Sequence, residues 1–320
     1  MSCSPARSES CSRSEPQVST IGGDPPLTRR QIRQIQAGAQ RALVPSPPPK
    51  PGGRAGRNLP AAIGVGVGLL GVLLASLFLR EEAFVVLALV ATSGGLWEFA
   101  RAVGTHGVTV PLLPLWVGNA GILVSAYTSG PAAMLVAFLL TAGGVLVWRV
   151  VDGGGPDAVR DACAGVLGSA YVSFLAGFAV LLLTEDKGPW LVLTFVLCAV
   201  ANDTGGYVAG VLLGKHPMAP SISPKKSWEG AGGSLLLAAV VGVGMATLAL
   251  DAPWWAGLLL GVGAVVTATV GDLAESLLKR DLGLKDMGTL LPGHGGILDR
   301  LDSLLMTAPV SYVLLTTFVS

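Results

Sequence analysis

The chain carries little charge for its length. Asp, Glu, Lys and Arg make up 13% of the 320 residues, whereas 51% are hydrophobic. A soluble protein normally carries about a quarter charged residues, so this composition excludes an ordinary soluble domain. The net charge of +1 gives no general attraction to nucleic acid, and no segment resembles a nucleic-acid-binding module.

Cysteine is also scarce, and the usual nucleophile and metal motifs are missing. The four cysteines, Cys3, Cys11, Cys163 and Cys198, lack metal-site spacing, so we interpret them as unpaired thiols. The chain has no P-loop, no His-Glu-x-x-His pair and no Ser/His/Asp order typical of a catalytic triad. Nucleophilic catalysis by a side chain is therefore not indicated.

Long apolar runs fill most of the chain. Several have about 20 residues, the length that crosses a bilayer core, and they are continuous, which disfavours a β-barrel. We predict an all-α polytopic membrane protein with about nine transmembrane helices. The expected spans are residues 59–79, 83–103, 108–127, 131–151, 158–183, 189–213, 231–250, 253–278 and 298–318.

The first 57 residues differ from the rest in composition. Residues 1–57 are rich in Pro, Ser and Arg and offer few side chains for a core, so we predict a disordered cytosolic tail. The membrane domain is expected to occupy residues 58–320. The start of the tail lacks the pattern of a secretory signal peptide.

The distribution of Lys and Arg predicts the orientation. With the N-terminus in the cytosol, all of the 21 Lys and Arg except Arg80 and Lys187 fall on the cytosolic side. Positive residues gather on that side of membrane proteins. Both charged loops, 214–230 and 279–297, then face the cytosol, and we expect a multi-pass protein of the plasma membrane.

The densest cluster of charge begins in the eighth expected span. Asp272, Glu275, Ser276 and Lys279 follow a helical spacing that places them on one face. An ion pair within that helix would explain them structurally. The ninth span, however, opens with Asp299, and a hairpin of the two helices would let Asp272 and Asp299 face each other. Two such carboxylates favour a divalent cation between them.

Further polar residues surround this cluster. Gly293-His294-Gly295-Gly296 forms a turn whose backbone amides suit phosphate binding. The loop 214–230 adds two lysines, which are either topology determinants or anion ligands. Asp203, inside an apolar span, needs a partner and is a metal ligand, a substrate contact or a partner for a lysine. We interpret Glu98, near Arg101, as part of a structural pair or as an interface anchor.

Residues 276–302 resemble the phosphatidate cytidylyltransferase, or CDP-diacylglycerol synthase, family. The family pattern is Ser-x-x-Lys-Arg, four residues, Lys-Asp, and then His-Gly-Gly-x-x-Asp-Arg-x-Asp. This chain matches it from Ser276 to Asp302 without a change in spacing. The segments 222–230 and 203–210 also resemble the family. The likeness covers most of residues 60–319.

The resemblance implies a reaction, a cofactor and a set of site residues. CTP and phosphatidic acid would give CDP-diacylglycerol and pyrophosphate, with a divalent cation, usually Mg²⁺, in a nine-helix fold. We expect metal ligands at Asp272, Asp299 and Asp302, with Asp203 as a further candidate. The expected catalytic residues are Lys225, Lys226, Ser276, Lys279, Arg280, Lys285, Asp286 and Arg300. The expected substrate-binding residues are Ser223, His294, Gly295, Gly296 and Asp203.

Two other classes of protein stay open at this point. A CTP-dependent lipid kinase, such as a polyprenol kinase, would attack the γ-phosphate instead of the α-phosphate. An ion-coupled transporter would use the acidic residues inside the spans, but would favour internal repeats. The expected partners are CTP, phosphatidic acid and membrane lipids, with no nucleic acid, and a homodimer is a further hypothesis.

Overall fold

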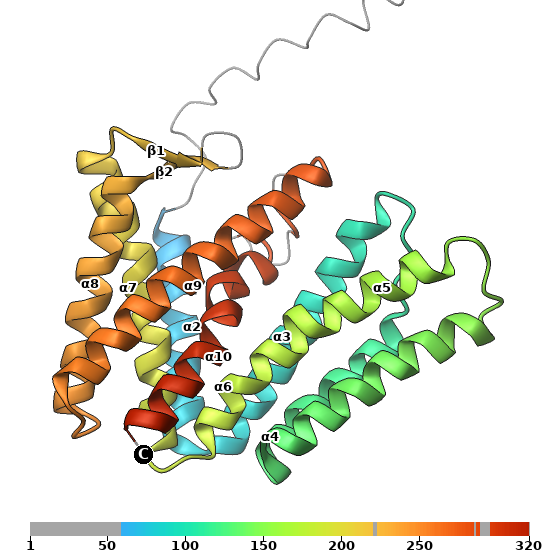
Figure 1. Ribbon diagram of the computed structural model, residues 1–320, viewed down its shortest axis with the longest axis horizontal. Coiled ribbons are helices and arrows are strands. Elements are labelled where there is room, and N and C mark those ends of the chain that lie inside the picture. The colour runs from blue at the N-terminus through green and yellow to red at the C-terminus, as the bar shows by residue number, and fades with distance from the viewer. Residues whose placement is uncertain (1–58, 220–222, 285, 289–294, 320) are drawn as a thin grey trace, which may run out of the picture. The chain divides into compact units, whose positions relative to one another are not determined.

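The computed structural model describes residues 59–219, 223–284, 286–288 and 295–319 (Figure 1). The tail that the sequence predicts at 1–57 lies outside them. Strands β1 (Pro217–Ala219) and β2 (Ser223–Ser227) form an antiparallel hairpin. The helices are α2 (Leu59–Leu79), α3 (Glu81–Gly104), α4 (Leu112–Val151), α5 (Ala158–Gly168), η1 (Ser169–Phe174), α6 (Leu175–Leu183), α7 (Gly188–Leu213), α8 (Trp228–Leu248), α9 (Trp254–Asp281) and α10 (Leu298–Phe318).

The predicted class of the fold is confirmed. Seven helices of the described residues are long and apolar enough to cross a membrane, so this is a multi-pass α-helical membrane protein. Helices α5, η1 and α6 make one continuous span, Ala158–Leu183. Judged by helix length and hydropathy, the predicted count of nine spans is not confirmed. Helix α2 contributes only a shorter apolar stretch, Gly66–Leu79, and α4 counts as one element although two spans were predicted there.

Helix α4 reverses direction in its middle. It has 40 residues, and Gly130, just before Pro131, has a non-helical backbone with φ of 80°. A proline ring removes a helical hydrogen bond and clashes with the preceding turn, which breaks the helix there. A side chain at Gly118 would overlap Thr141, so the two halves of α4 lie against each other as an antiparallel pair.

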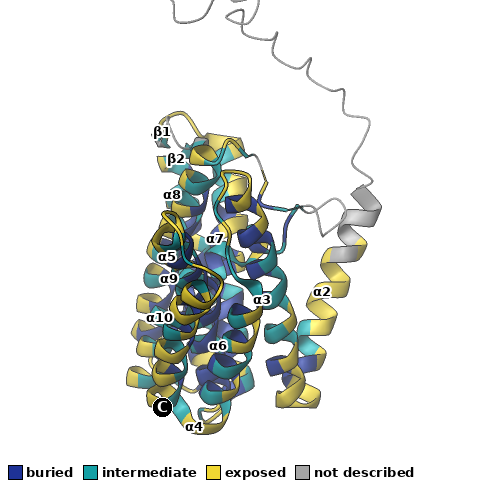
Figure 2. Cartoon of the chain, turned by 90° about the vertical axis from the view of Figure 1, so that its right-hand side faces the viewer, coloured by how far each residue is buried: buried dark blue, intermediate teal, exposed yellow. Residues whose placement is uncertain are grey.

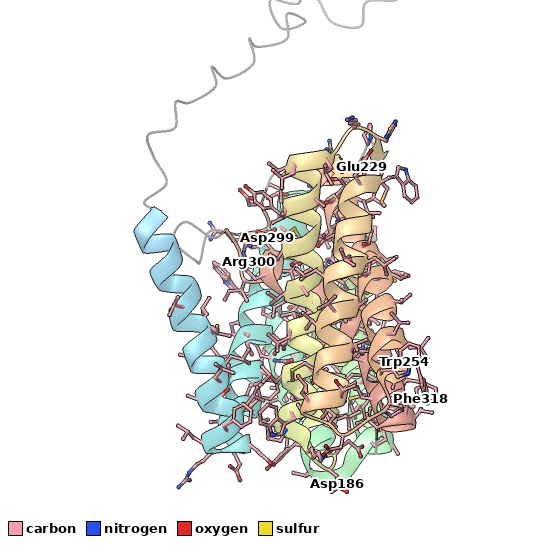
Figure 3. All side chains as sticks on the ribbon, turned by 90° about the vertical axis from the view of Figure 1, so that its left-hand side faces the viewer. Asp186, Glu229, Trp254, Asp299, Arg300 and Phe318 are labelled. Atoms are coloured by element: carbon pink, nitrogen blue, oxygen red, sulfur yellow. The ribbon has the colours of Figure 1, made fainter. Side chains whose placement is uncertain are left out.

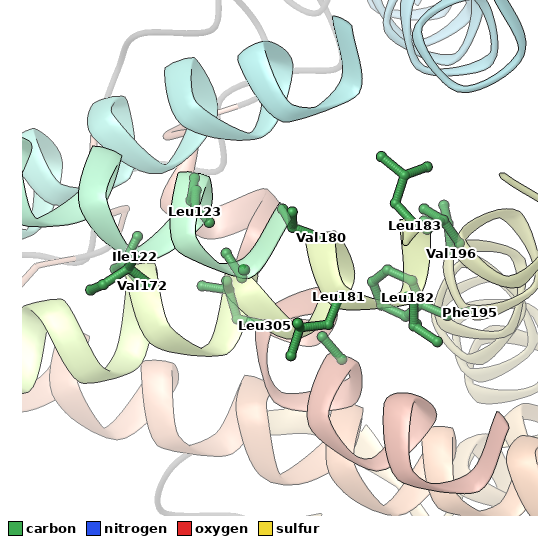
Figure 4. Packing of buried hydrophobic residues seen from close by; sticks show 14 of the residues in the cluster. Ile122, Leu123, Val172, Val180, Leu181, Leu182, Leu183, Phe195, Val196 and Leu305 are labelled. Carbon is green, nitrogen blue, oxygen red and sulfur yellow. The ribbon is translucent and has the colours of Figure 1, made fainter. Parts of the chain in front are cut away.

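The apolar core lies around α6. Val180, Leu181, Leu182 and Leu183 are all buried, and they pack among side chains from α4, α7 and α10 (Figure 4). Four consecutive buried positions mean that α6 has protein on every side, as expected of a central helix. Helix α2, in contrast, is exposed along most of its described length (Figure 2).

Small residues bring α7, α8 and α9 together. Added side chains at Gly205 or Gly233 would overlap the other helix's backbone, and Gly242 and Gly257 make the same kind of contact between α8 and α9. Close backbone approach through glycine is a common way for membrane helices to associate without a hydrophobic driving force. This packing fixes where the polar residues of α7 and α9 lie relative to β2.

The two ends of the helices differ in chemistry. Glu229, Asp299 and Arg300 lie toward one end, and Asp186, Trp254 and Phe318 toward the other (Figure 3). At the second end, Lys187 Nζ lies 2.8 Å from Asp251 Oδ2 and joins two loops. A hydrogen bond from Lys187, reinforced by its charge, lowers the pKa of Asp251 below its usual value.

Candidate active site

A lysine from the hairpin and an aspartate from α9 form the first polar group of the site. Lys226 Nζ lies 2.6 Å from Asp272 Oδ2, and Ser303 Oγ, on α10, donates to Asp272 Oδ1 at 2.8 Å. Three elements distant in sequence therefore meet at one carboxylate. The contact with Lys226 holds β2 against the C-terminal half of α9.

A cavity of about 270 Å³ opens beside this pair. It lies between α7, α8, α9 and the hairpin. Both partners of the Lys226–Asp272 pair line it, together with Asp203, so two carboxylates and an ammonium group face the same space. The remaining lining residues are Asn202, Gly206, Tyr207, Met218, Ser227, Gly230, Ala231, Ser234 and Thr269.

Asp203 is fixed by its neighbours on α7 and α8. Asn202 Nδ2 donates to Asp203 Oδ1 at 2.9 Å, and Ser234 Oγ donates to the carbonyl oxygen of Asn202 at 2.6 Å. Asp203 is also close enough to Asp272 and Lys226 for their charges to interact. The alternatives that the sequence leaves open for Asp203 therefore stay predictions, since its carboxylate lies near both Asp272 and Lys226.

The hairpin that carries Lys226 is anchored by Glu229. Glu229 Oε2 accepts the backbone N–H groups of Lys215 and His216, each at 3.2 Å, and Glu229 Oε1 lies 2.6 Å from His216 Nδ1. Ser227 caps α8 by accepting the N–H of Gly230 at 3.1 Å. These contacts close the loop before α8 and so set the position of Lys226.

A second polar group forms where α9 meets the start of α10. Lys279 Nζ lies 2.9 Å from Asp299 Oδ1 and 3.4 Å from Glu275 Oε1. Asp299 Oδ2 also accepts the N–H groups of Gly296 at 2.9 Å and Met287 at 3.1 Å. The carboxylate thus ties together both ends of the loop that joins α9 and α10.

Asp302 lies between the two groups. Its carboxyl group is beside that of Glu275 and is close enough to Asp272 for the charges to interact. Like charges at close range repel unless a proton or a cation lies between them. Asp272, Glu275 and Lys279 of the stripe that the sequence predicts on α9 thus each lie near a side chain of α10.

Asp272 and Asp299 are not arranged as two carboxylates that share one partner. Each carboxylate has its own lysine, Lys226 for Asp272 and Lys279 for Asp299. Within the described ranges, no three His, Cys, Asp or Glu side chains stand close enough together to hold a metal ion by themselves. Hard carboxylate oxygens are present, but an ion there would need further ligands.

The remaining predicted residues are distributed around the two groups. Ser223 is the first residue of β2. Gly295, with φ of 80°, directly precedes Gly296, whose N–H donates to Asp299. Asp286 is exposed just before Met287. Ser276, Arg280 and Arg300 lie on the ends of α9 and α10 that border the site. Lys285, His294 and the side chain of Lys225 lie outside the described residues.

Of the two interpretations of Glu98, a structural pair with Arg101 or an interface anchor, the structure supports the second. Arg101 lies over the ring of Trp97, with 5.2 Å to the ring centre. Glu98 Oε2 instead accepts the N–H of Leu298, the first residue of α10, at 2.9 Å. An acidic residue inside an apolar span signals a buried partner, but helical spacing pointed to the nearest arginine.

Tyr171 is a residue that sequence reasoning missed. It lies in the π-helical turn η1, and its hydroxyl group is buried without a hydrogen-bond partner among the described residues. This hydroxyl group is near enough to Glu275, Asp302 and Asp272 for electrostatic interaction. Single π-helical turns are often found at functional sites, but no feature of the sequence predicted one here.

Comparison with known proteins places these features in a family. Residues 60–318 match the cytidylyltransferase family. A protein of Mycobacterium leprae named phosphatidate cytidylyltransferase is 40% identical over 306 residues, covering 91% of this chain and 97% of the relative. A protein of the same name from Mycobacterium bovis is 39% identical, with coverage of 82% and 90%. One from Synechocystis is 32% identical, with coverage of 80% and 94%.

Proposed function

The chain belongs to the cytidylyltransferase family, and we propose that it transfers the CMP group of CTP to phosphatidic acid. The products are CDP-diacylglycerol and pyrophosphate, which makes it a nucleotidyltransferase of phospholipid biosynthesis. One observation carries this conclusion: the 40% identity to a phosphatidate cytidylyltransferase extends over 91% of the chain. The kinase and transporter alternatives are not favoured.

The reaction requires two anions to meet. An oxygen of the phosphatidic acid phosphate forms a bond to the α-phosphorus of CTP, and the bond from that phosphorus to the bridging oxygen breaks. Pyrophosphate leaves with the electron pair. Because the attacking phosphate is already anionic, no strong general base is needed. The main task of the site is to reduce charge repulsion and to stabilise the leaving group.

Lys226 and Lys279 are suited to that task. Both ammonium groups are partly shielded from solvent and oriented by a carboxylate. Shielding strengthens their attraction for phosphate oxygens. We assign Arg280, Arg300, Lys225 and Lys285 the same neutralising role, and assign Ser223, Ser276, His294, Gly295 and Gly296 to hydrogen bonding with the substrates. Asp286, exposed in the loop between α9 and α10, is assigned to the same site.

A Mg²⁺ ion is the proposed cofactor. Its proposed protein ligands are one or two of the carboxylates of Asp272, Asp299 and Asp302, with Asp203 at the same cavity as Asp272. Mg²⁺ in proteins is commonly held by one or two carboxylates, with substrate phosphates and waters completing its shell. This donor set suits an ion that arrives with the triphosphate better than one held by protein alone. When bound, the ion would neutralise developing charge on the phosphates.

We propose nine membrane crossings, with the site facing the cytosol at the plasma membrane. Support for nine comes from the two antiparallel halves of α4 and from the length of α2. Support for the orientation comes from Lys and Arg, of which only Arg80 and Lys187 fall on the opposite side in this arrangement. A cytosolic site gives direct access to soluble CTP while phosphatidic acid approaches from the bilayer.

Membrane lipids and a second copy of the chain are the other proposed partners. Large apolar side chains such as Leu79, Leu140 and Leu248 are exposed and suit contact with lipid tails. A homodimer would be recognised from the mass of the protein in detergent, measured by light scattering. A mass of one chain at all concentrations would exclude it.

Product analysis tests the proposed function. Purified protein in lipid nanodiscs would be given labelled CTP, phosphatidic acid and Mg²⁺, and CDP-diacylglycerol and pyrophosphate would be measured. We expect the two products in equal amounts. Release of CDP with a newly phosphorylated lipid would show a kinase and overturn the proposal.

A further inference from the structure

Glu98 is a completely buried acidic residue outside the predicted site. It lies on α3, its exposed fraction is 0%, and Oε2 accepts the N–H of Leu298 at 2.9 Å. The two residues are 200 positions apart in the chain. A buried carboxyl group is unfavourable without hydrogen bonds or charge partners. This contact therefore connects α3 specifically to the first residue of α10.

Two glycines lie so close to the same carboxyl group that neither has room for a side chain. A side chain added at Gly288 would overlap the carboxyl group of Glu98, and one added at Gly296 would lie 2.6 Å from Glu98 Oε2. The same added side chain at Gly296 would also lie 2.9 Å from the backbone nitrogen of Gly288. Both flanks of the loop between α9 and α10 thus pack directly on Glu98.

The same backbone segments hold Asp299. Gly296 and Met287 donate their N–H groups to Asp299 Oδ2, at 2.9 Å and 3.1 Å. Asp299 in turn lies 2.9 Å from Lys279 Nζ. A continuous set of contacts therefore runs from Glu98, through the backbone near Gly288 and Gly296, to Asp299 and Lys279.

We propose that Glu98 is a positioning residue for the reaction, acting on Asp299 through this backbone. It does not touch the substrates; it fixes the start of α10 and both flanks of the loop. Displacement of a catalytic group by about 1 Å can lower the rate about 100-fold. The inference rests on the proposed function, because it assumes that Asp299 takes part in the chemistry.

Three variants test the proposal: Glu98→Ala, Glu98→Gln and, as a matched control, Asp161→Asn. The Gln carbonyl oxygen can still accept the N–H of Leu298, so Glu98→Gln is expected to keep kcat within about threefold. Glu98→Ala is expected to lower kcat about 10- to 100-fold, with a smaller change in KM for CTP. Equal loss in Glu98→Gln and Glu98→Ala would overturn positioning through the amide.

The control separates positioning from general stability. Asp161 is also buried, at 1% exposed, and also accepts a distant backbone N–H, that of Thr109 at 3.1 Å. It pairs with Arg149 at 2.7 Å, away from the two polar groups of the site. Asp161→Asn is expected to lower the melting temperature in detergent while leaving kcat within about twofold. A fall in kcat equal to that of Glu98→Ala, at equal melting temperature, would overturn the proposal.

A second measurement does not depend on activity. Hydrogen–deuterium exchange over residues 295–301 should be faster in Glu98→Ala than in the unmodified protein, and unchanged in Glu98→Gln. Identical exchange in all three proteins would overturn the contact on which the proposal rests. If the unmodified protein makes no CDP-diacylglycerol, the proposed function fails, and that result is separate from the exchange result.

Discussion

The ammonium group of Lys226 lies 2.6 Å from a carboxylate oxygen of Asp272, although the two residues are 46 positions apart. Their side chains are 27% and 25% exposed, so the pair is accessible from the cavity that both residues line. Partly exposed pairs contribute little to stability. We infer that the ion pair orients the ammonium group of Lys226 and the carboxylate of Asp272 toward the substrate. A substrate phosphate can then replace the carboxylate as the partner of Lys226.

Replacing Lys226 should impair catalysis much more than stability. In Lys226→Gln we expect kcat/KM for CTP to fall about 100-fold or more, because a positive charge next to the triphosphate is lost. The measurement is initial-rate kinetics in nanodiscs. Lys187→Gln is the matched control, since Lys187 also pairs with an aspartate, Asp251, but at the other end of the helices. Activity within about threefold of normal in Lys226→Gln would contradict this role.

Asp272 and Asp299 should each be essential. We expect Asp272→Asn and Asp299→Asn to lower turnover by about three orders of magnitude, because transition-state electrostatics is usually the largest catalytic contribution. Both proteins should remain folded, as judged by size-exclusion chromatography. Asp251→Asn, at the opposite end, should keep its activity. More than half of normal activity in either site variant, at saturating Mg²⁺, would rule out the assigned role.

Cysteine labelling can determine the orientation. The four native cysteines would first be replaced by serine. A membrane-impermeant thiol reagent added to intact cells should then label cysteines introduced at Asp186 and Asp251. Cysteines introduced at Lys215 and Asp281 should react only after the cells are opened. All four positions are exposed in the described structure. Labelling of Lys215→Cys in intact cells would reverse the proposed orientation.

Adjacent glycines of α8 should tolerate a methyl group very differently. An alanine at position 233 would overlap Gly205 O and Ala209 of α7, whereas position 232 has nothing within 4 Å. We expect Gly233→Ala to destabilise the protein by about 1–3 kcal/mol, as overpacking does. Gly232→Ala should be neutral or stabilising by up to about 1 kcal/mol, through helix propensity. Thermal unfolding in detergent would compare them, and equal melting temperatures would refute close packing of α7 and α8.

Much of the architecture could be predicted from the sequence, because membrane insertion depends on local composition. A helix satisfies its own backbone hydrogen bonds, so a run of about 20 apolar residues is sufficient to indicate a span. The predicted spans 158–183 and 298–318 coincide with the α5–α6 unit and with α10. Gly130-Pro131, where α4 reverses, was also visible as a boundary between two predicted spans.

The sequence by itself also determined the family and predicted residues of the site, since the motif from Ser276 to Asp302 is a local pattern. Only the tertiary structure decided which of those residues meet. Helical spacing places residues three, four or seven positions apart on one face, and so it grouped Glu98 with Arg101 and Asp272 with Lys279. Packing through small residues of α7, α8 and α9 instead brought Lys226 to Asp272, and the burial of α3 against α10 brought Glu98 to Leu298. Such partners depend on how closely separate helices approach each other, and the periodicity of one helix does not specify that distance.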